Sequence, residues 1–265
     1  MINLKQCKEV FLNHLEQHED KTTLGFELKL KHTFRVMKIS KELCKKLNLS
    51  KEESKLAQVV ALLHDIGRFE EIRYNKKLDS AKYDHATVGV DLLFKDNVID
   101  KFNIEKKYYN IIEVAVYNHS RKSIPEGLNK EELLQTKIIR DADKLDNFIL
   151  KIRGKIDSCF PGNIKNIEEV NNSLISDKVY KSIMNKECVD VHDRETKLDL
   201  FICVLGFIYD LNFIESLEIV KEKNYINRII DRFNYTNSDT LEKMENIRKQ
   251  LNTYIEEKLR NNTTK

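Results

Sequence analysis

The chain has 265 residues, with 46 Lys and Arg against 43 Asp and Glu, and its net charge is +3. This length suits one large domain, or one domain with an appended helical region. The nearly balanced charges exclude a strong electrostatic signal for nucleic acid or for an acidic membrane surface. Basic clusters such as Lys29 with Lys31, and Lys106 with Lys107, are therefore expected to be solvated helix faces.

Cysteine usage and hydropathy indicate where such a chain resides. The five cysteines are Cys7, Cys44, Cys159, Cys188 and Cys203. They are odd in number and far apart, without a CxxC pair, so neither a disulfide framework nor a thiolate zinc site is expected. No charged start precedes an apolar run, and no run approaches the roughly 18 apolar residues of a membrane span. We expect a cytoplasmic protein with free thiols and no membrane partner.

Apolar residues recur at helical spacing along most of the chain. Two prolines and seven glycines leave room for long helices, and strand-like alternation is nearly absent. In chain order, the apolar stripes cover residues 4–15, 36–47, 56–63, 88–93, 111–116, 134–149, 201–211 and 244–255. This pattern predicts an all-α fold, a bundle of successive helices.

Turn residues predict where several of these helices begin and end. Gly67 is expected to stop the third helix, and Asp84 to cap the N-terminus of the fourth. Residues 123–128, with a proline and a glycine, are expected to form a loop. The polar end, residues 261–265, should fray.

Residues 154–172 form the longest stretch without a clear stripe, and they contain Pro161 and Gly162. We expect either a substrate loop or the joint to a tail region. The predicted domains are therefore residues 1–153, a helical domain with an N-terminal helix, and residues 154–265, a C-terminal helical region. These last helices either complete the same core or form the interface of a homodimer.

Four of the seven histidines fall on the apolar faces of four separate predicted helices. They are His32, His64, His85 and His119. One histidine in such a place is more often a hydrogen-bonded core residue than a ligand. Four imidazoles with adjoining carboxylates, buried without partners, would cost several kcal/mol in desolvation. Divalent metal ions would remove that cost. The remaining histidines, His14, His18 and His192, are expected to lie on the surface.

Carboxylates accompany these histidines. Asp65 directly follows His64 in the string HDIGR, so both can reach one metal and the carboxylate can bridge to a second. The string RDADKLDN adds Asp141, Asp143 and Asp146. Asp141 and Asp143 lie about 200° apart on a helix and cannot both point at one ion. Apolar periodicity does not choose between these two.

In this order, His32, HDIGR, DHATVG, NHS and DADKLDN resemble the metal-binding motifs of the HD superfamily of metal-dependent phosphohydrolases. The resemblance covers roughly residues 28–150 and implies an HD-domain helical bundle with additional C-terminal helices. In the two-metal branch of the family, Asp65 would bridge two ions, and the preference for Asp143 over Asp141 rests on this likeness. The implied ligands are His32, His64, Asp65, His85, His119 and Asp143.

Such a centre would hold two divalent transition-metal ions and use a metal-activated hydroxide to cleave a phosphate ester. Imidazole and carboxylate suit Fe, Mn, Co, Ni or Zn better than Ca or Mg. With Asp65, the resemblance makes Arg68 and Lys144 the catalytic set, and both would bind the substrate phosphate. The alternative for Arg68 and Lys144 is an ordinary salt bridge to a neighbouring carboxylate such as Glu70 or Asp146. Arg121 and Lys122 are weaker candidates for phosphate binding, expected on the surface.

The predicted activity is hydrolysis of a nucleotide or another small phosphate mono- or diester, with no specific nucleic-acid partner. Two alternatives remain open: a di-iron oxygenase of the same superfamily, and a catalytically silent nucleotide-sensing module. The chain lacks a P-loop, a GxGxxG string and an HExxH string. The GYP extension typical of cyclic-dinucleotide phosphodiesterases is also missing after His119.

Overall fold

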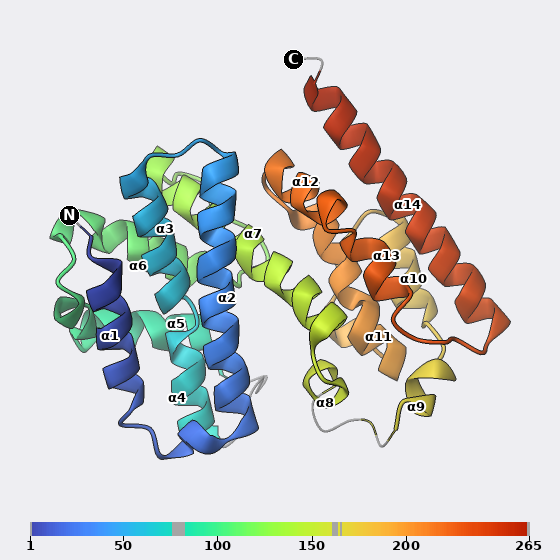
Figure 1. The fold of residues 1–265 in the computed structure, drawn as a ribbon, viewed down its shortest axis with the longest axis horizontal. Coiled ribbons are helices and arrows are strands. Elements are labelled where there is room, and N and C mark those ends of the chain that lie inside the picture. The colour runs from blue at the N-terminus through green and yellow to red at the C-terminus, as the bar shows by residue number, and fades with distance from the viewer. Residues whose placement is uncertain (1, 76–82, 161–163, 165, 264–265) are drawn as a thin grey trace. The chain divides into compact units, whose positions relative to one another are not determined.

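The computed structural model describes residues 2–75, 83–160, 164 and 166–263 (Figure 1). All regular secondary structure within these ranges is helical, which confirms the predicted all-α fold. The chain divides into two compact units, Met1–Asp143 and Lys144–Lys265. This division lies inside helix α7 (Lys130–Arg153), whereas the sequence placed a boundary where that helix ends. None of the described helices is both long and apolar enough to cross a membrane.

Unit 1 is a bundle in which α2 packs along α3, and α3 also contacts α1 and α6 (Figure 1). Its helices before α7 are α1 (Leu4–Leu15), η1 (Glu19–Thr22), α2 (Leu24–Lys46), α3 (Lys51–Leu63), α4 (Ile66–Asn75), α5 (His85–Val90), η2 (Asp91–Lys95), η3 (Val98–Phe102), η4 (Lys106–Tyr108) and α6 (Tyr109–Asn118). Further along the bundle, α5 packs between α4 and α6.

Helix α3 is the centre of this unit. It begins at a capping box, in which Ser50 and Glu53 exchange hydrogen bonds between side chain and backbone. Its last turns are apolar on every side, and all residues from Val59 to Leu63 are buried. Each fully buried Val or Leu stabilises the fold by about 1.5–3 kcal/mol. The C-terminal end of α3 is therefore firmly held.

The helix break predicted near Gly67 exists, but it falls earlier in the chain. Helix α3 ends at Leu63, and α4 begins at Ile66, so Gly67 lies inside the first turn of α4. The prediction that Gly67 stops the helix was wrong. A Cβ atom on Gly67 would lie 2.1 Å from the carbonyl oxygen of His85 and 2.7 Å from the amide nitrogen of Gly89. The glycine is needed because α4 and α5 approach at this point.

Two further local predictions for unit 1, a helix cap and a loop, are confirmed. Asp84 caps α5, since its side chain accepts a hydrogen bond from the Thr87 amide. Residues 123–128 form the expected loop between α6 and α7. All five cysteines of the chain are free.

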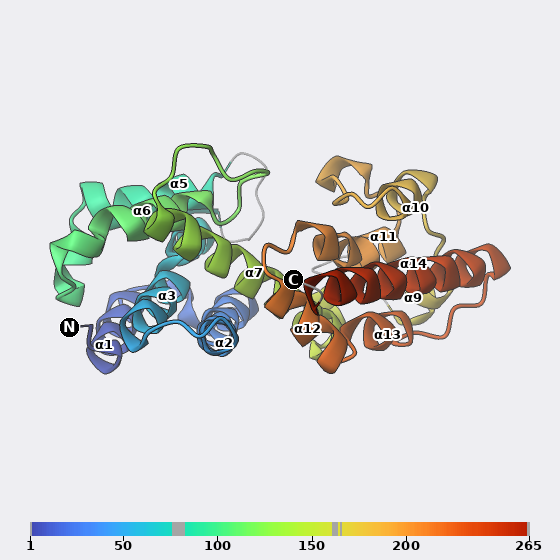
Figure 2. The same ribbon diagram turned by 90° about the horizontal axis from the view of Figure 1, so that it is seen from above.

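Unit 2 is built around the long helix α14. Its helices after α7 are α8 (Ile156–Cys159), α9 (Glu168–Asn171), α10 (Asp177–Met184), η5 (Val191–Asp193), α11 (Lys197–Ile202), η6 (Cys203–Asp210), α12 (Ile214–Glu222), α13 (Tyr225–Ile230) and α14 (Ser238–Thr263). Helices α10, α12 and α13 pack on α14, and Figure 2 shows α10 on one side of it and α13 on the other.

Three predictions for unit 2 are changed by the structure. The single helix predicted over residues 201–211 is divided between α11 and the tighter helix η6. Helix α14 continues through residues 261–263, which were expected to fray. Residues 154–172 contain the short helices α8 and α9, while Pro161 and Gly162 lie outside the described residues.

Candidate metal centre

The structure brings all six predicted ligands together inside unit 1. His32 lies in the middle of α2, and His64 caps the end of α3 with Asp65 in the turn that follows. His85 is the first residue of α5, His119 caps the end of α6, and Asp143 lies on α7. Five stretches that are distant in the sequence therefore supply one cluster.

The six side chains form two groups of three. One group is His32, His64 and Asp143, and the other is Asp65, His85 and His119; within each group the potential ligand atoms lie within 4.8 Å of one another. The Nε2 atoms of His32 and His64 are 3.3 Å apart, and those of His85 and His119 are 3.1 Å apart. His32 Nε2 lies 3.2 Å from Asp143 Oδ1.

Asp65 lies between the two pairs of histidines and turns one carboxylate oxygen to each pair. Its Oδ2 atom lies 3.4 Å from His32 Nε2 and 3.6 Å from His64 Nε2. Its Oδ1 atom lies 3.5 Å from His85 Nε2 and 3.6 Å from His119 Nε2. This is the arrangement that a carboxylate adopts when it bridges two cations.

Backbone carbonyl groups orient two of the imidazoles. His64 Nδ1 donates to the Ala61 carbonyl at 2.8 Å, and His119 Nδ1 donates to the Val116 carbonyl at 2.6 Å. A carbonyl oxygen only accepts, so in a neutral ring the proton sits on Nδ1 and Nε2 keeps its lone pair. Both lone pairs therefore point into the cluster.

Burial keeps the rings of His64 and His85 neutral. It lowers the pKa of His64 to about 4 and that of His85 to about 3. Burial opposes ionisation of Asp65, but Lys29 and the surrounding imidazoles outweigh it and hold the pKa of Asp65 well below its usual value. The pKa of Asp143 is lowered in the same way, since His32 outweighs the effect of burial. The cluster thus combines the neutral imidazoles of His64 and His85 with the ionised carboxylates of Asp65 and Asp143.

This donor set fits divalent transition-metal ions. Lone pairs and carboxylate oxygens face one another at 3.1–3.6 Å. Around a tetrahedral ion with bonds of about 2.1 Å, ligand atoms are about 3.4 Å apart. Residues His32, His64 and Asp143 would hold one ion and His85 and His119 a second, with Asp65 between them.

Residues 30–147 match the family model of the HD domain. This stretch of the chain is an HD domain, the domain that defines the HD superfamily. This superfamily comprises metal-dependent phosphohydrolases, and HD domains bind divalent metals. No curated protein and no solved structure matches the chain.

Asp143, and not Asp141, is the aspartate of α7 that belongs to this cluster of the HD domain. Asp141 and Asp146 are both fully buried, but neither lies in any of the His, Cys and carboxylate groups found among the described residues. The sequence could not separate Asp141 from Asp143 by periodicity, because buried polar residues occur on more than one side of α7.

Lys29 was expected on a solvated helix face, and this expectation was wrong. Its ammonium group lies 2.8 Å from Asp65 Oδ2, and its side chain is only 22% exposed. Lys31, by contrast, is exposed and pairs with Glu27 on the same helix. Lys29 precedes His32 by three residues, so the two share a face of α2. This spacing was the signal that could have placed Lys29 at the site.

Of the two main residues predicted to bind phosphate, Arg68 lies beside the cluster and Lys144 is paired with a carboxylate of unit 2. Arg68 lies beside the cluster, with Nε 3.9 Å from Asp65 Oδ1 and Nη1 2.7 Å from Glu71 Oε2. Its carboxylate partner is therefore Glu71 and not Glu70. Lys144 pairs with Asp210 of η6 at 2.9 Å.

Arg121 is half-buried and holds the start of α5. Its guanidinium group lies 2.8 Å from Asp84 Oδ2 and donates to Thr87 Oγ1 at 3.0 Å. Asp84 immediately precedes His85, and Arg121 follows His119 by two residues. Arg121 thus ties together the segments that carry these two histidines. Lys122 is exposed, as expected.

Of the histidines expected on the surface, only His192 is exposed. The prediction was wrong for the other two, because His18 is buried and His14 is half-buried. Both lie near Glu70, outside the six-residue cluster.

Proposed function

We propose that this chain is a two-metal phosphohydrolase that cleaves a nucleotide or another small phosphate mono- or diester. The observation that carries the proposal is the Asp65 carboxylate, whose two oxygens face two separate groups of ligand atoms. A site for one ion would not need this division. The six-ligand set of the two-metal branch accounts for every residue of both groups.

Two bound divalent ions would activate a water molecule and neutralise the charge that develops on the phosphate. The residues of the chain would hold this arrangement in place. His64 and His119 are fixed by the Ala61 and Val116 carbonyls, so their Nε2 atoms need no reorientation. The Asp65 carboxylate would set the distance between the two ions, because its two oxygens face different pairs of histidines.

Charge at the site favours an anionic substrate. Two carboxylates, Asp65 and Asp143, face the space for two divalent ions, which would leave an excess of positive charge. Lys29 and Arg68 flank Asp65 on its Oδ2 and Oδ1 sides. We propose that Lys29 and Arg68 contact the substrate phosphate when metal ions occupy the cluster. In the absence of ions, both side chains lie beside Asp65.

The accessible side of the site is consistent with this role. His64 and His119 are buried, whereas the side chains of Asp143, Lys29 and Arg68 are partly exposed. A phosphate group would therefore enter from the side that carries these partly exposed cationic and carboxylate side chains. Lys144 remains a candidate for substrate binding, which would require it to leave Asp210.

Elemental analysis of the purified chain, together with a screen of phosphate esters in defined metals under anaerobic conditions, tests the proposal. We expect two transition-metal ions at the cluster and hydrolysis of an ester such as bis(p-nitrophenyl) phosphate. His64→Ala and Asp65→Ala should lose metal and turnover while keeping their helical content, and His192→Ala is the matched control. Turnover retained in either site variant, or a requirement for dioxygen, would contradict the proposal.

A further inference from the structure

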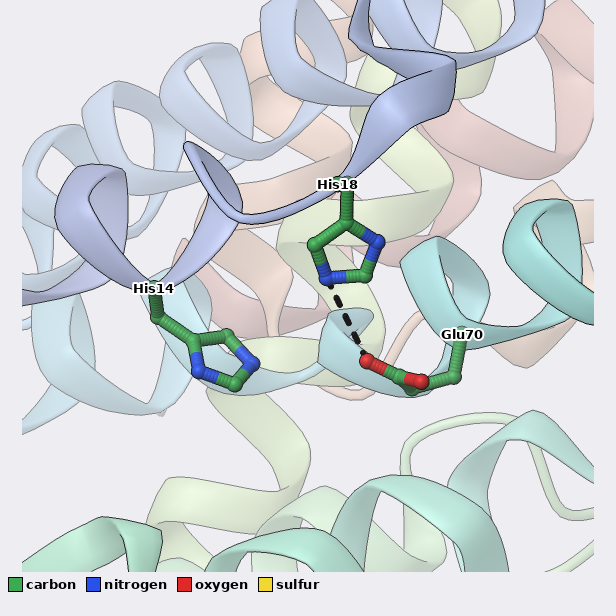
Figure 3. A group of neighbouring side chains, drawn as sticks. All are labelled: His14, His18 and Glu70. Carbon is green, nitrogen blue, oxygen red and sulfur yellow. Dashed lines mark ion pairs between the residues drawn. The ribbon is translucent and has the colours of Figure 1, made fainter.

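A second cluster of potential ligands lies outside the six-residue centre, at the junction of α1, η1 and α4. His14 is near the end of α1, His18 immediately precedes η1, and Glu70 lies on α4. Figure 3 shows the two rings and the carboxylate turned toward one another. Their potential ligand atoms lie within 4.8 Å of one another, and His18 Nε2 is 3.3 Å from Glu70 Oε1.

The local chain path produces this convergence. Helix α1 ends at Leu15, so His18 does not continue the helical face of His14. The turn after α1 instead brings the two rings to a centroid separation of 5.9 Å. Glu70 reaches them from α4, which packs against η1.

Polar atoms of both rings are buried without a partner. His14 Nε2 and His18 Nδ1 have no hydrogen-bond partner among the described residues. The His18 and Glu70 residues are only 5% and 7% exposed. A buried polar atom left without a partner costs about 1–3 kcal/mol. His18 faces Glu70 through Nε2, so the unpartnered atom that an ion in this cluster would satisfy is His14 Nε2.

We propose that His14, His18 and Glu70 bind one divalent transition-metal ion, separate from the binuclear centre. Two imidazoles and one carboxylate form a donor set for zinc and for ferrous iron, with the remaining positions open to water. Glu70 can supply Oε1, because its Oε2 atom faces Arg73 at 3.5 Å. Burial also lowers the pKa of His14, which keeps that ring in the neutral form that binds metals.

The third ion would cross-link the end of α1 to α4. Helix α4 starts directly after Asp65 and carries Arg68. The ion would therefore stabilise the position of the helix that presents this arginine, although it shares no ligand with the six-residue centre. The inference goes beyond the proposed hydrolysis and does not depend on it.

Titration of the metal-stripped full-length chain with Co²⁺ tests the inference in a background without the binuclear centre. In a His64→Ala, His119→Ala variant we expect one bound Co²⁺ per chain, seen by its visible d–d absorption. Adding Glu70→Gln or His18→Gln should remove this absorption. Adding His192→Gln, at an exposed histidine, should leave it unchanged, and far-UV circular dichroism checks folding of each protein.

A second measurement keeps the inference testable if the background variant does not fold. Elemental analysis of the otherwise unchanged chain, loaded with Zn²⁺ and freed of excess, should give one ion fewer per chain for Glu70→Gln than for His192→Gln. An equal zinc content in these two variants, or Co²⁺ absorption that survives Glu70→Gln, would overturn the inference. If Glu70→Gln loses one ion as expected but the unchanged chain hydrolyses no phosphate ester, only the proposed function is refuted.

Discussion

Removing metal from this protein should make its stability depend on pH in the range where histidines titrate. His64 and His85 have pKa values lowered from 6.5 to about 4 and about 3 in the folded chain. Below pH 6.5 the unfolded chain binds protons that the folded chain does not, so the free energy of unfolding falls as the pH falls. The contribution is fully present above pH 6.5 and is lost as the pH falls toward the folded pKa values.

The size of this loss follows from the same pKa values. At pH 5, each of the two histidines lowers the free energy of unfolding by about 2 kcal/mol relative to pH 8. Asp65 and Asp143 do not offset the loss in this range. Their folded pKa values lie below the ordinary 3.8, so their stabilising contribution changes only at more acidic pH.

Urea unfolding in excess EDTA, followed by far-UV circular dichroism at pH 8, 6.5 and 5, measures this dependence. A His64→Gln, His85→Gln variant should show a pH dependence weaker by about 4 kcal/mol between pH 8 and pH 5. The His192→Gln control should behave as the unchanged chain does. An equal pH dependence in the unchanged chain and in the double variant would refute the argument that burial keeps these rings neutral.

Other predictions test the packing and the site separately. Gly67→Ala should lower the free energy of unfolding by about 2 kcal/mol or more and reduce metal content, because its Cβ would meet the α5 backbone. Gly127→Ala, at a positive φ with open space, should cost about 1 kcal/mol in urea unfolding and leave metal content unchanged. Asp143→Asn should reduce the amount of bound metal, measured by elemental analysis. An unchanged metal content in this variant would show that Asp143 is not a ligand. Arg121→Gln should lower turnover because the variant retains metal less tightly. Kinetics at saturating metal should therefore show restored turnover and an unchanged KM. Lys29→Gln should raise KM for a phosphate ester more than it changes kcat, and an unchanged KM would exclude contact with the phosphate.

The long helices and most of the residues of the six-residue cluster could be predicted from the sequence because both depend on local patterns. Apolar spacing predicted the long helices α1, α3, α7 and α14, and the order of the histidine motifs predicted the family. Helices α10, α12 and α13 were missed because, at six to nine residues each, they are too short for an apolar stripe to repeat. The choice of Asp143 needed either the family resemblance or the structure, since α7 buries polar groups on more than one side.

The features that sequence reasoning missed depend on contacts between distant residues. Lys29 looked like a solvated lysine until the turn after α3 placed Asp65 beside it. Gly67 looked like a helix terminator, whereas its small size is required by the α5 backbone. His14 and His18 looked exposed because Glu70, the third member of their cluster, lies on another helix.

The two histidines that end their helices suggest a local rule that a sequence can supply. The last carbonyl groups of an α-helix have no amide partner within the helix. His64 and His119 each occupy the position after the last helical residue and donate Nδ1 to the carbonyl three residues earlier. Each helix end thereby fixes the tautomer and aims Nε2 beyond the helix. A histidine at the end of a strongly apolar helix is therefore a better candidate ligand than one in mid-helix, because its orientation is set before any metal binds.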